Sequence, residues 1–351
     1  MLGTSCHNRM LIYIWSSMTN FLPITRWVIP SLIAIIPHMS IAKLNSSINL
    51  GIDNDGIVTT DKDYTNGLFL TYSDHFQIKP DGFLDSLPGT QFSAASNDDL
   101  IRKYNIEIGQ QMWTPADIEN PDPIANDRPY AGLLYLSSTL YSIAPSVINS
   151  YRLLIGTVGP NAYAEESQKY VHGIIKSADP KGWDHQISNQ FVFNLGYQRV
   201  DKWYQSDFSG STTHEVSTPT RLLIGNYKSE LATGLMWRWG RELNHSFGSA
   251  RVSNESTLDP SLIVRGNTGW YLFSGIEGRI RFNDITIDGD RPDEGITADE
   301  VEHFQGTATI GVTGYYHGWG ASLALSTKSS DYKEDQNSVH TNGSFAFFWL
   351  F

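Results

Sequence analysis

The chain has 351 residues, a net charge of −12, 18% charged residues and 12% aromatic residues. This length suits two ordinary domains or one large β domain. Nucleic-acid binding needs clustered Lys and Arg, which the acidic sequence lacks, so a nucleic-acid partner is excluded. The single cysteine, Cys6, excludes a disulfide framework and a zinc site made of cysteines.

The first 42 residues resemble a secretory signal peptide with an unusually long leading region. Residues 26–42 read RWVIPSLIAIIPHMSIA, a basic start and an apolar stretch that end in a small-x-small cleavage pattern. The alternative is a short membrane anchor, but Pro30 and Pro37 interrupt the stretch, and it is shorter than the ~20 residues of a spanning helix. We therefore expect residues 1–42 to be cleaved and residues 43–351 to fold.

The rest of the chain alternates between two kinds of side chain. In LATGLMWRW, Leu231, Leu235 and Trp237 fall on one face of an extended strand. Many such runs reach the ~9–11 residues of a tilted membrane strand. Their second face is small and polar, as in a barrel lumen, and aromatic residues gather near their ends. These features predict an all-β fold, a transmembrane antiparallel β-barrel, because only a closed barrel pairs every strand in lipid.

Twelve strands are predicted, and a helix-compatible run, residues 162–172, falls between the fifth and sixth. The polar stretch 241–268 has no clear assignment. The predicted strands are 45–55, 64–76, 102–113, 129–143, 148–158, 189–204, 213–225, 229–240, 269–281, 302–315, 319–329 and 341–351.

The last strand ends on the C-terminal residue. Its alternate aromatics are expected to face lipid, and they are Phe345, Phe347, Trp349 and Phe351. The opposite face carries Phe348 and Leu350, which we expect to pack on the N-terminal strand where the barrel closes. A terminal Phe after such a strand resembles the signal read by the outer-membrane assembly machinery, which is therefore an expected partner.

Strand parity places the loops. In a barrel with an even number of strands, both termini lie at the periplasmic rim, and the odd-numbered connections are extracellular. Segments 56–63, 114–128 and 159–188 then share the outer rim, whereas the turn at 144–147 is short, as a periplasmic turn should be.

These outer segments bring together residues suited to hydrolysis. Gln168 and His172 are four apart, so they share one face of a helix. Asn54, Asp55 and Thr65 flank the first loop. A neutral imidazole can take a proton from water, and carboxylate and amide oxygens can hold a hard cation such as Ca²⁺ that stabilises an oxyanion.

Each residue also has a plainer interpretation. A His on a loop helix is more often a surface residue than a base, and Asn54-Asp55-Gly56 resembles an ordinary turn. An EF-hand is excluded because its first and twelfth positions would be Gly51 and Lys62. Asp127-Arg128 reads as an ion pair at the rim.

Ordered motifs over most of the chain after residue 42 resemble the lipid A 3′-O-deacylase family of Gram-negative outer membranes. The block VGPNAYAEESQKYVHGII followed by GWDHQISN is the most specific of them. The full set is IDND (52–55), DKDYTNGLFL (61–70), WTP (113–115), DRPYAG (127–132), VGPNAYAEESQKYVHGII (158–175), GWDHQISN (182–189) and the terminal aromatic strand.

The resemblance implies a twelve-stranded outer-membrane barrel with its active site at the extracellular rim. It also implies Ca²⁺-dependent hydrolysis of the ester that holds the 3′ acyloxyacyl group of lipid A, the substrate in the outer leaflet. His172 would be the base, and Asn54, Asp55, Thr65 and Gln168 would be the other functional residues, with Asp55 and Asn54 in contact with the metal.

The chain departs from the family pattern at two places. A characterised member has an active-site Lys in the second outer loop, where residues 114–126 here contain no Lys or Arg. The same member has a Glu six residues after the catalytic His, where this chain has Ala178.

Two other functions fit the sequence. One is a barrel without catalytic activity, such as a narrow pore or an adhesin. The other is an outer-membrane phospholipase of the Ser-His type, for which Ser167 and Ser177 lie near His172 in the sequence. The sequence has neither a G-x-S-x-G elbow nor an H-E-x-x-H zinc helix.

Overall fold

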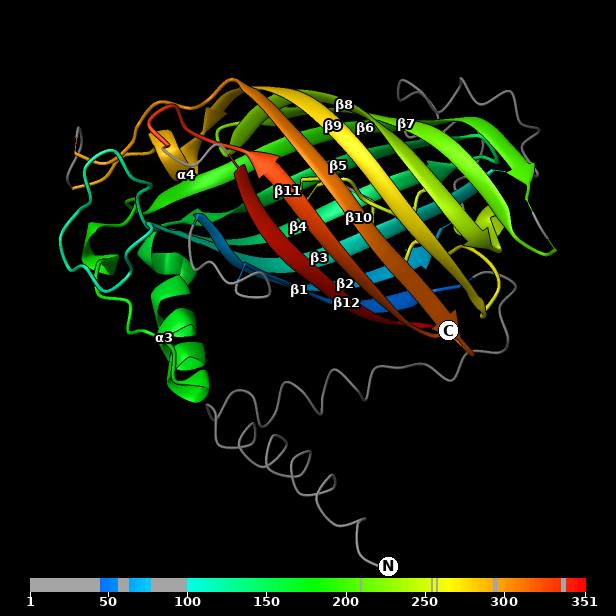
Figure 1. Cartoon of the computed structure of the whole chain (residues 1–351), viewed down its shortest axis with the longest axis horizontal. Coiled ribbons are helices and arrows are strands. Elements are labelled where there is room, and N and C mark those ends of the chain that lie inside the picture. Colours follow the sequence, from blue (N-terminus) through cyan, green and yellow to red (C-terminus); the bar gives the residue numbers. More distant parts are fainter. Residues whose placement is uncertain are drawn as a thin grey trace, which may run out of the picture. The chain divides into compact units, whose positions relative to one another are not determined.

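The structure, a computed structural model, describes residues 45–55, 63–76, 100–208, 210–253, 255–256, 258–292, 296–335 and 339–351. In these ranges the chain forms twelve antiparallel strands that close into one barrel (Figure 1). The strands are β1 (Ser47–Asn54), β2 (Asp63–His75), β3 (Ile101–Thr114), β4 (Ala131–Ile143), β5 (Val147–Val158), β6 (Gln190–Asp207), β7 (Thr213–Gly225), β8 (Lys228–Arg241), β9 (Gly269–Asp284), β10 (Phe304–Tyr316), β11 (Trp319–Ser329) and β12 (Val339–Leu350).

The predicted twelve-stranded antiparallel barrel is confirmed. Each predicted strand overlaps its counterpart, and β6 and β9 extend furthest beyond the predicted ends. The barrel closes where β1 pairs with β12, from Ser47 opposite Leu350 to Asn54 opposite Gly343. The expected signal peptide, residues 1–42, lies outside the described residues.

The helices lie in the connections between strands. α3 (Ala164–Ile175) follows β5 and confirms the predicted helix, and α4 (Ile285–Asp288) follows β9. Three short 3-10 helices are η4 (Pro160–Ala162), η5 (Trp183–His185) and η6 (Leu243–His245). No helix in the described ranges is long and apolar enough to cross a membrane.

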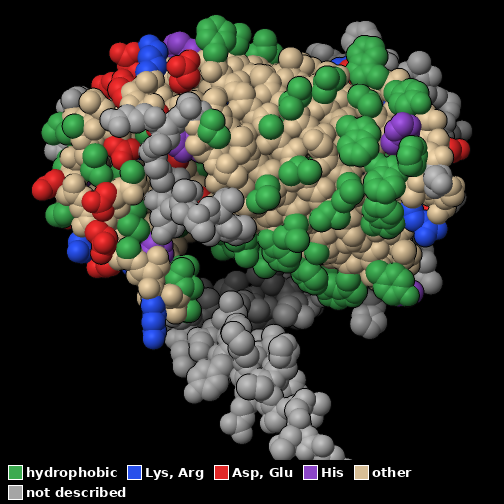
Figure 2. Space-filling view, viewed as in Figure 1, with side chains coloured by type: hydrophobic (Ala, Val, Ile, Leu, Met, Phe, Trp, Pro, Cys, Tyr) green, Lys and Arg blue, Asp and Glu red, His purple; other side chains and the backbone are tan. Residues whose placement is uncertain are grey.

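The odd-numbered strands all finish at the same end of the barrel, which we call the loop rim. Figure 1 shows α3 at this end and the C-terminus at the other, which we call the terminal rim. The turns between β4 and β5, β6 and β7, and β10 and β11 at the terminal rim are short. Figure 2 shows charged side chains gathered around the loop rim and hydrophobic side chains spread over the wall.

The outer face of the wall is an apolar belt, because alternate side chains of a strand point to opposite faces. Exposed aromatics lie near both rims, for example Phe282 and Phe304 towards the loop rim and Trp203 and Tyr316 towards the terminal rim. Such a belt with aromatic borders is typical of an outer-membrane barrel. Exposed aliphatic residues of the belt include Leu50, Leu68, Ile106, Ile108, Leu136, Leu153, Ile155, Leu195, Leu222, Leu235, Ile276, Ile310 and Leu323.

The connection between β8 and β9, residues 242–268, folds back into the lumen and fills it. We call it the plug. Its Phe247, Leu258 and Leu262 form one buried cluster with side chains on the inner face of the wall, among them Tyr141 and Val200. This stretch has no strand or helix period, so its sequence predicts no element; in the structure it is an interior segment.

Ion pairs also attach the plug to the wall. Arg251 Nη2 lies 3.3 Å from Asp53 Oδ1, and Glu255 lies 3.3 Å from Lys228 Nζ. Glu255 also lies 3.2 Å from a guanidinium nitrogen of each of Arg279 and Arg281. Buried charges are costly unless they are paired, so these contacts hold the plug in one position.

The plug also accounts for the apolar inner face of the last strand. Phe348 and Leu350 are buried in a cluster with Ile263 of the plug and Tyr315 of β10. As expected, they lie beside the N-terminal strand, opposite Asn49 and Ser47 of β1, and the plug adds the apolar surface that covers them. Phe345 and Phe347 are exposed on the outer face, as predicted.

Candidate functional site

The loop rim holds all five predicted site residues, three on β1 and β2 and two on α3. Asn54 ends β1, Asp55 follows it, and Thr65 lies near the start of β2. The pairing of β2 with β3 shifts between Tyr64 and Asn66, so Thr65 occupies a β-bulge. Bulges re-aim side chains and are common at barrel rims.

Hydrogen bonds join these three residues directly. The Thr65 carbonyl accepts from Asn54 Nδ2 and from the Asp55 backbone N–H, each at 3.3 Å. The Thr65 hydroxyl lies 2.6 Å from the Thr114 hydroxyl at the end of β3. Thr65 and Asp55 are almost fully buried. The set therefore forms one ordered cluster and not a loose turn.

The second part of the site lies on α3. Its buried residues are Ala164, Gln168 and His172, spaced by four, so one stripe of the helix faces the protein. Two left-handed residues bracket the helix: Tyr163 at φ 56° before it and Lys176 at φ 59° after it. The chain reverses at Lys176 and brings Ala178 back to the helix.

This reversal orients His172. Its Nδ1 lies 2.5 Å from the Ala178 carbonyl oxygen, which only accepts hydrogen bonds. A neutral imidazole that donates Nδ1–H there keeps Nε2 as its proton acceptor. A backbone carbonyl thus orients His172, and this contact is not predictable from the sequence because it does not depend on the residue type at position 178.

Gln168 has one satisfied and one unsatisfied end. Its Oε1 accepts a hydrogen bond from Trp183 Nε1 at 2.8 Å. Trp183 packs on Tyr130, with ring centroids 4.8 Å apart. The Gln168 amide nitrogen is buried and has no hydrogen-bond partner among the described residues. A buried unpaired donor is costly, so this nitrogen is a candidate contact for a bound ligand.

The end of β3 connects the two parts. Met112 belongs to the cluster of Ala164, Tyr130 and Trp183, and two residues later Thr114 bonds to Thr65. Alternate strand residues share a face, so Met112 and Thr114 point the same way.

That face is the outer one. Exposed Ile106 and Ile108 share the parity of Met112 and Thr114, whereas the next residues, Glu107 and Gln111, line the lumen. At Gly132 of β4, an added Cβ would lie 2.5 Å from the Ala164 Cβ, so α3 packs tightly on the outside of the wall. The candidate site therefore faces away from the lumen, at the outer surface of the barrel.

Oxygen atoms dominate the possible metal ligands. Asn54 uses its amide nitrogen for Thr65, which leaves its Oδ1 as a possible metal ligand, and Asp55, the next residue, adds a carboxylate. Ca²⁺ takes six to eight oxygen ligands, so backbone oxygens or waters would complete the set. No group of three or more His, Cys, Asp or Glu side chains gathers as a metal site in the described ranges. The donors present fit a hard cation and not a transition metal.

A buried arginine, Arg128, connects the loops next to this cluster. Arg128 Nη1 lies 2.6 Å from Asp63 Oδ1 and 3.2 Å from Asp331 Oδ2, and Nη2 donates to the Thr286 hydroxyl at 2.8 Å. The expected side-chain pair with Asp127 was wrong: Asp127 instead accepts from the Tyr332 hydroxyl and from backbone N–H groups. Arg128 thus ties three loops to the residue two before Thr65.

The buried carboxylates of this network are held ionised. Burial opposes ionisation of Asp331, but Lys328 and Arg128 outweigh it and hold the pKa of that carboxyl well below its usual range. Asp331 and Arg128 therefore form a charged pair over the whole neutral range.

Comparisons with known proteins agree with this architecture. The family model described as "Outer membrane protein LpxR" matches residues 28–351. The solved structure of LpxR from Salmonella typhimurium aligns with a TM-score of 0.71 and 18% identity, over 87% of this chain and 100% of that chain. At this identity the likeness shows a shared fold.

Two other barrels are similar only in outline. The translocator domain of the autotransporter NalP from Neisseria meningitidis has a TM-score of 0.42 and 10% identity, over 97% of this chain and 98% of that one. The β domain of the Bordetella autotransporter BrkA has a TM-score of 0.41 and 6% identity, over 88% and 98%. A search of curated proteins found no match.

Proposed function

The chain belongs to the LpxR family of outer-membrane proteins, and we propose that it is an esterase that removes the 3′-linked acyloxyacyl chain of lipid A. The observation that carries the proposal is the position of the site. His172 and the buried Gln168 amide nitrogen lie on a helix packed against the outside of the wall. A hydrolase of membrane lipids needs its catalytic groups on the lipid-facing side, and a pore or a lumenal enzyme does not.

His172 is the proposed base. Its Nδ1–H donates to the Ala178 carbonyl, and Nε2 takes a proton from water. The water oxygen attacks the ester carbonyl carbon, the bond from that carbon to the sugar oxygen breaks, and the proton passes to the sugar oxygen. The products are the free acyloxyacyl acid and a 3′ hydroxyl on lipid A.

Charge on the carbonyl oxygen needs stabilisation as the water attacks. The Gln168 amide nitrogen is a free buried donor for this oxygen. Asp55 and Asn54 would hold Ca²⁺, which supplies positive charge to an oxyanion when bound. Thr65 positions these two residues through its carbonyl and is itself fixed by Thr114.

We place the loop rim at the extracellular side, with lipopolysaccharide of the outer leaflet as substrate. Three of the five connections at the terminal rim are short turns, which supports this because periplasmic turns of such barrels are short. The solvent-facing side of α3 also supports it, since Val171, Ile174 and Ile175 are exposed there and suit a helix at a membrane interface.

The alternatives are less well supported. The plug fills the lumen, which disfavours an open pore. For a Ser-His phospholipase, the Ser167 hydroxyl would have to face His172, but it donates to the Tyr163 carbonyl at 2.9 Å. We also propose that the outer-membrane assembly machinery recognises the C-terminal aromatic strand of this chain during biogenesis.

The test is hydrolysis of purified lipid A by the refolded protein, followed by mass spectrometry with Ca²⁺ or with a chelator. We expect loss of the acyloxyacyl mass with Ca²⁺ only. The substitution His172→Ala should reduce turnover roughly 10²–10⁴-fold, while the heat-dependent gel shift of a folded barrel stays unchanged. Intact lipid A in every condition with folded wild-type protein would refute the proposal, and full turnover by His172→Ala would remove His172 from the mechanism.

A further inference from the structure

A groove of about 740 Å³ lies on the outer face of the wall at the terminal rim, at the opposite end from the candidate active site. Its outward-facing lining comes from β8 to β12. We propose that this groove binds one glycerophospholipid, with an acyl chain on the groove floor and the phosphate on Arg241. The proposal rests on the barrel spanning a membrane and is independent of lipid A hydrolysis.

The strand register builds the groove. Arg241, Trp270, Gly314, Ala321 and Phe347 follow one another as direct cross-strand partners on β8, β9, β10, β11 and β12. They therefore form a single row on the outer face, about 14 Å long between Trp270 and Phe347. The two middle residues are the smallest in the row, and a Cβ added at Gly314 would meet no atom within 4 Å.

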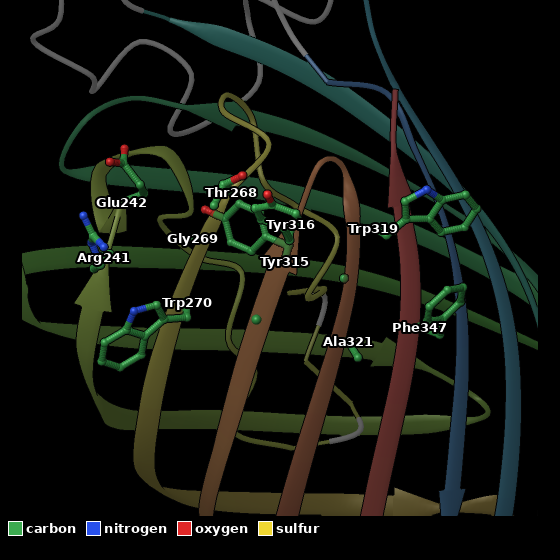
Figure 3. Close-up of a pocket in the computed structure, with 12 residues that line it drawn as sticks. Arg241, Glu242, Thr268, Gly269, Trp270, Tyr315, Tyr316, Trp319, Ala321 and Phe347 are labelled. Carbon is green, nitrogen blue, oxygen red and sulfur yellow. The ribbon is translucent and has the colours of Figure 1, made fainter. Parts of the chain in front are cut away.

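Larger side chains enclose this low floor. Trp270 stands on one side and Phe347 on the other, as Figure 3 shows. Towards the rim, Tyr316 and Trp319 are paired with each other and close the groove. Towards the middle of the belt, the next outward row brings Val312 opposite Leu272. An aliphatic chain lying there would contact apolar side chains on all sides and would be shielded at the interface by aromatic rings.

A cation stands at the open end. Arg241 is exposed, ends β8, and has no acidic partner among the described residues. The neighbouring Glu242 also lines the groove, and its carboxylate lies 3.0 Å from His245 Nδ1. A guanidinium at the level of the aromatic border can bind a phosphate with two parallel hydrogen bonds. An apolar groove with a free arginine at its interfacial end suits a phospholipid better than an uncharged lipid.

The test is native mass spectrometry of protein taken from vesicles of phosphatidylglycerol mixed with diacylglycerol of the same acyl chains. We expect one retained phosphatidylglycerol per wild-type chain. Gly314→Phe fills the floor and should lower its occupancy roughly tenfold, as expected for the loss of contacts with about two methylene groups. The matched control is Gly278→Phe on β9, whose added Cβ also meets no atom within 4 Å but which lies outside the groove.

A second pair of variants tests the headgroup. Arg241→Gln should remove the preference for phosphatidylglycerol over diacylglycerol, whereas Arg265→Gln, which removes the same charge from an exposed loop residue, should keep it. Ala321→Phe provides a second filled floor if Gly314→Phe does not show the gel shift of a folded barrel.

Three results would overturn the proposal: a wild type without retained lipid, equal retention in both filled variants, or a dimer that filling the groove dissociates. The last would assign the groove to a second copy of the chain. Lipid A turnover should be unchanged in the folded groove variants, so a failure of the proposed hydrolysis and a failure of lipid retention are separate results.

Discussion

The two ends of the Gln168 amide have different roles: the oxygen has a structural contact, and we assign a function to the nitrogen. Its oxygen holds Trp183, while its buried nitrogen has no partner in the described part of the chain. Evolution for stability alone would favour a side chain without that donor, because an unpaired buried donor costs about 1–3 kcal/mol. Because the unpaired nitrogen of Gln168 lowers the stability of the fold, we infer that it forms its hydrogen bond with the substrate.

We therefore predict opposite effects on stability and activity for Gln168→Met. The thioether has a similar length, is a weak acceptor for the Trp183 N–H and has no donor. The variant should unfold at an equal or higher denaturant concentration, and its turnover should fall roughly 10²–10³-fold, as for loss of one oxyanion donor. Lipid A turnover and chemical unfolding measure the two effects.

Glu166→Gln, on the exposed side of the same helix, is the control and should alter neither quantity. If Gln168→Met kept wild-type turnover, the amide nitrogen would have no role in the reaction.

Sequence reasoning predicted that the five candidate residues share one rim, and the structure has all five there because strand parity determines the end of the barrel at which each loop lies. It could not find the contacts that orient them. The Ala178 carbonyl is a backbone atom, and the Thr65 bulge depends on how β2 registers against β3. Thr114 could have been predicted as part of the site, since strand parity alone places it on the same face as Met112 and Gln110.

At the scale of elements, the position of α3 depends on Gly132 in the wall beneath it. Gly132→Val should push the helix outward, because the added Cβ would lie 2.5 Å from the Ala164 Cβ and 3.2 Å from that of Ala162. A displacement of about 1 Å can cost roughly a hundredfold in rate. We expect that loss of lipid A turnover in a barrel that still shows its heat-dependent gel shift.

Gly306→Val on β10 is the matched control, since an added Cβ there meets only one atom, at 3.9 Å. Equal turnover in the two variants would show that the position of α3 does not limit the reaction.

The loops of the loop rim depend on Arg128. Arg128→Ala leaves Asp63 and Asp331 buried without this cation, and breaking a buried pair typically costs about 3–5 kcal/mol. The partly exposed pair of Arg199 and Asp201 provides a control, since its loss should cost at most about 1 kcal/mol. Chemical unfolding of Arg128→Ala and Arg199→Ala measures both.

The pH dependence has a definite sign. The folded pKa of Asp331 is lower than its unfolded value of about 3.9, so the pair contributes fully above that pH and is lost only as the pH falls towards the folded value. The effect of Arg128→Ala should therefore be equal at neutral pH and at pH ~5. An effect that had already vanished at the lower pH would contradict an ionised Asp331.

Strands were the most predictable elements. A membrane barrel enforces strict alternation along each strand, so the twelve patterns in the sequence correspond to the twelve strands of the structure. The plug was not predictable, because its side chains follow no period. Its partners are also distant in sequence: Arg251 pairs with Asp53, and Asp259 accepts from Asn49.

For the whole molecule, the plug in the lumen leads us to expect a barrel that does not conduct ions. Arg241 and Trp270 are cross-strand partners, so a short turn can join β8 to β9 if residues 244–266 are removed. We expect this deletion to give conductance steps in planar bilayers, because the remaining inner wall is polar and would fill with water. The wild type should show none.

The conductance of Glu255→Ala should lie between that of the wild type and that of the plug deletion. This substitution leaves Lys228, Arg279 and Arg281 without one shared carboxylate and should give brief openings, whereas Glu300→Gln, which breaks an exposed pair with Lys333, should give none. A folded deletion variant that stays silent would show that another segment closes the lumen.

The contact of Phe348 and Leu350 with Ile263 also couples the seam of the barrel to the plug. The seam between β1 and β12 is the last gap to close in the wall, and the strand that closes it carries two apolar side chains into the lumen. If the plug were still outside, those side chains would meet water and the seam would gain little from closing. Closure of the wall is therefore more stable when the plug is inside, because the plug covers the apolar side chains that the last strand carries into the lumen.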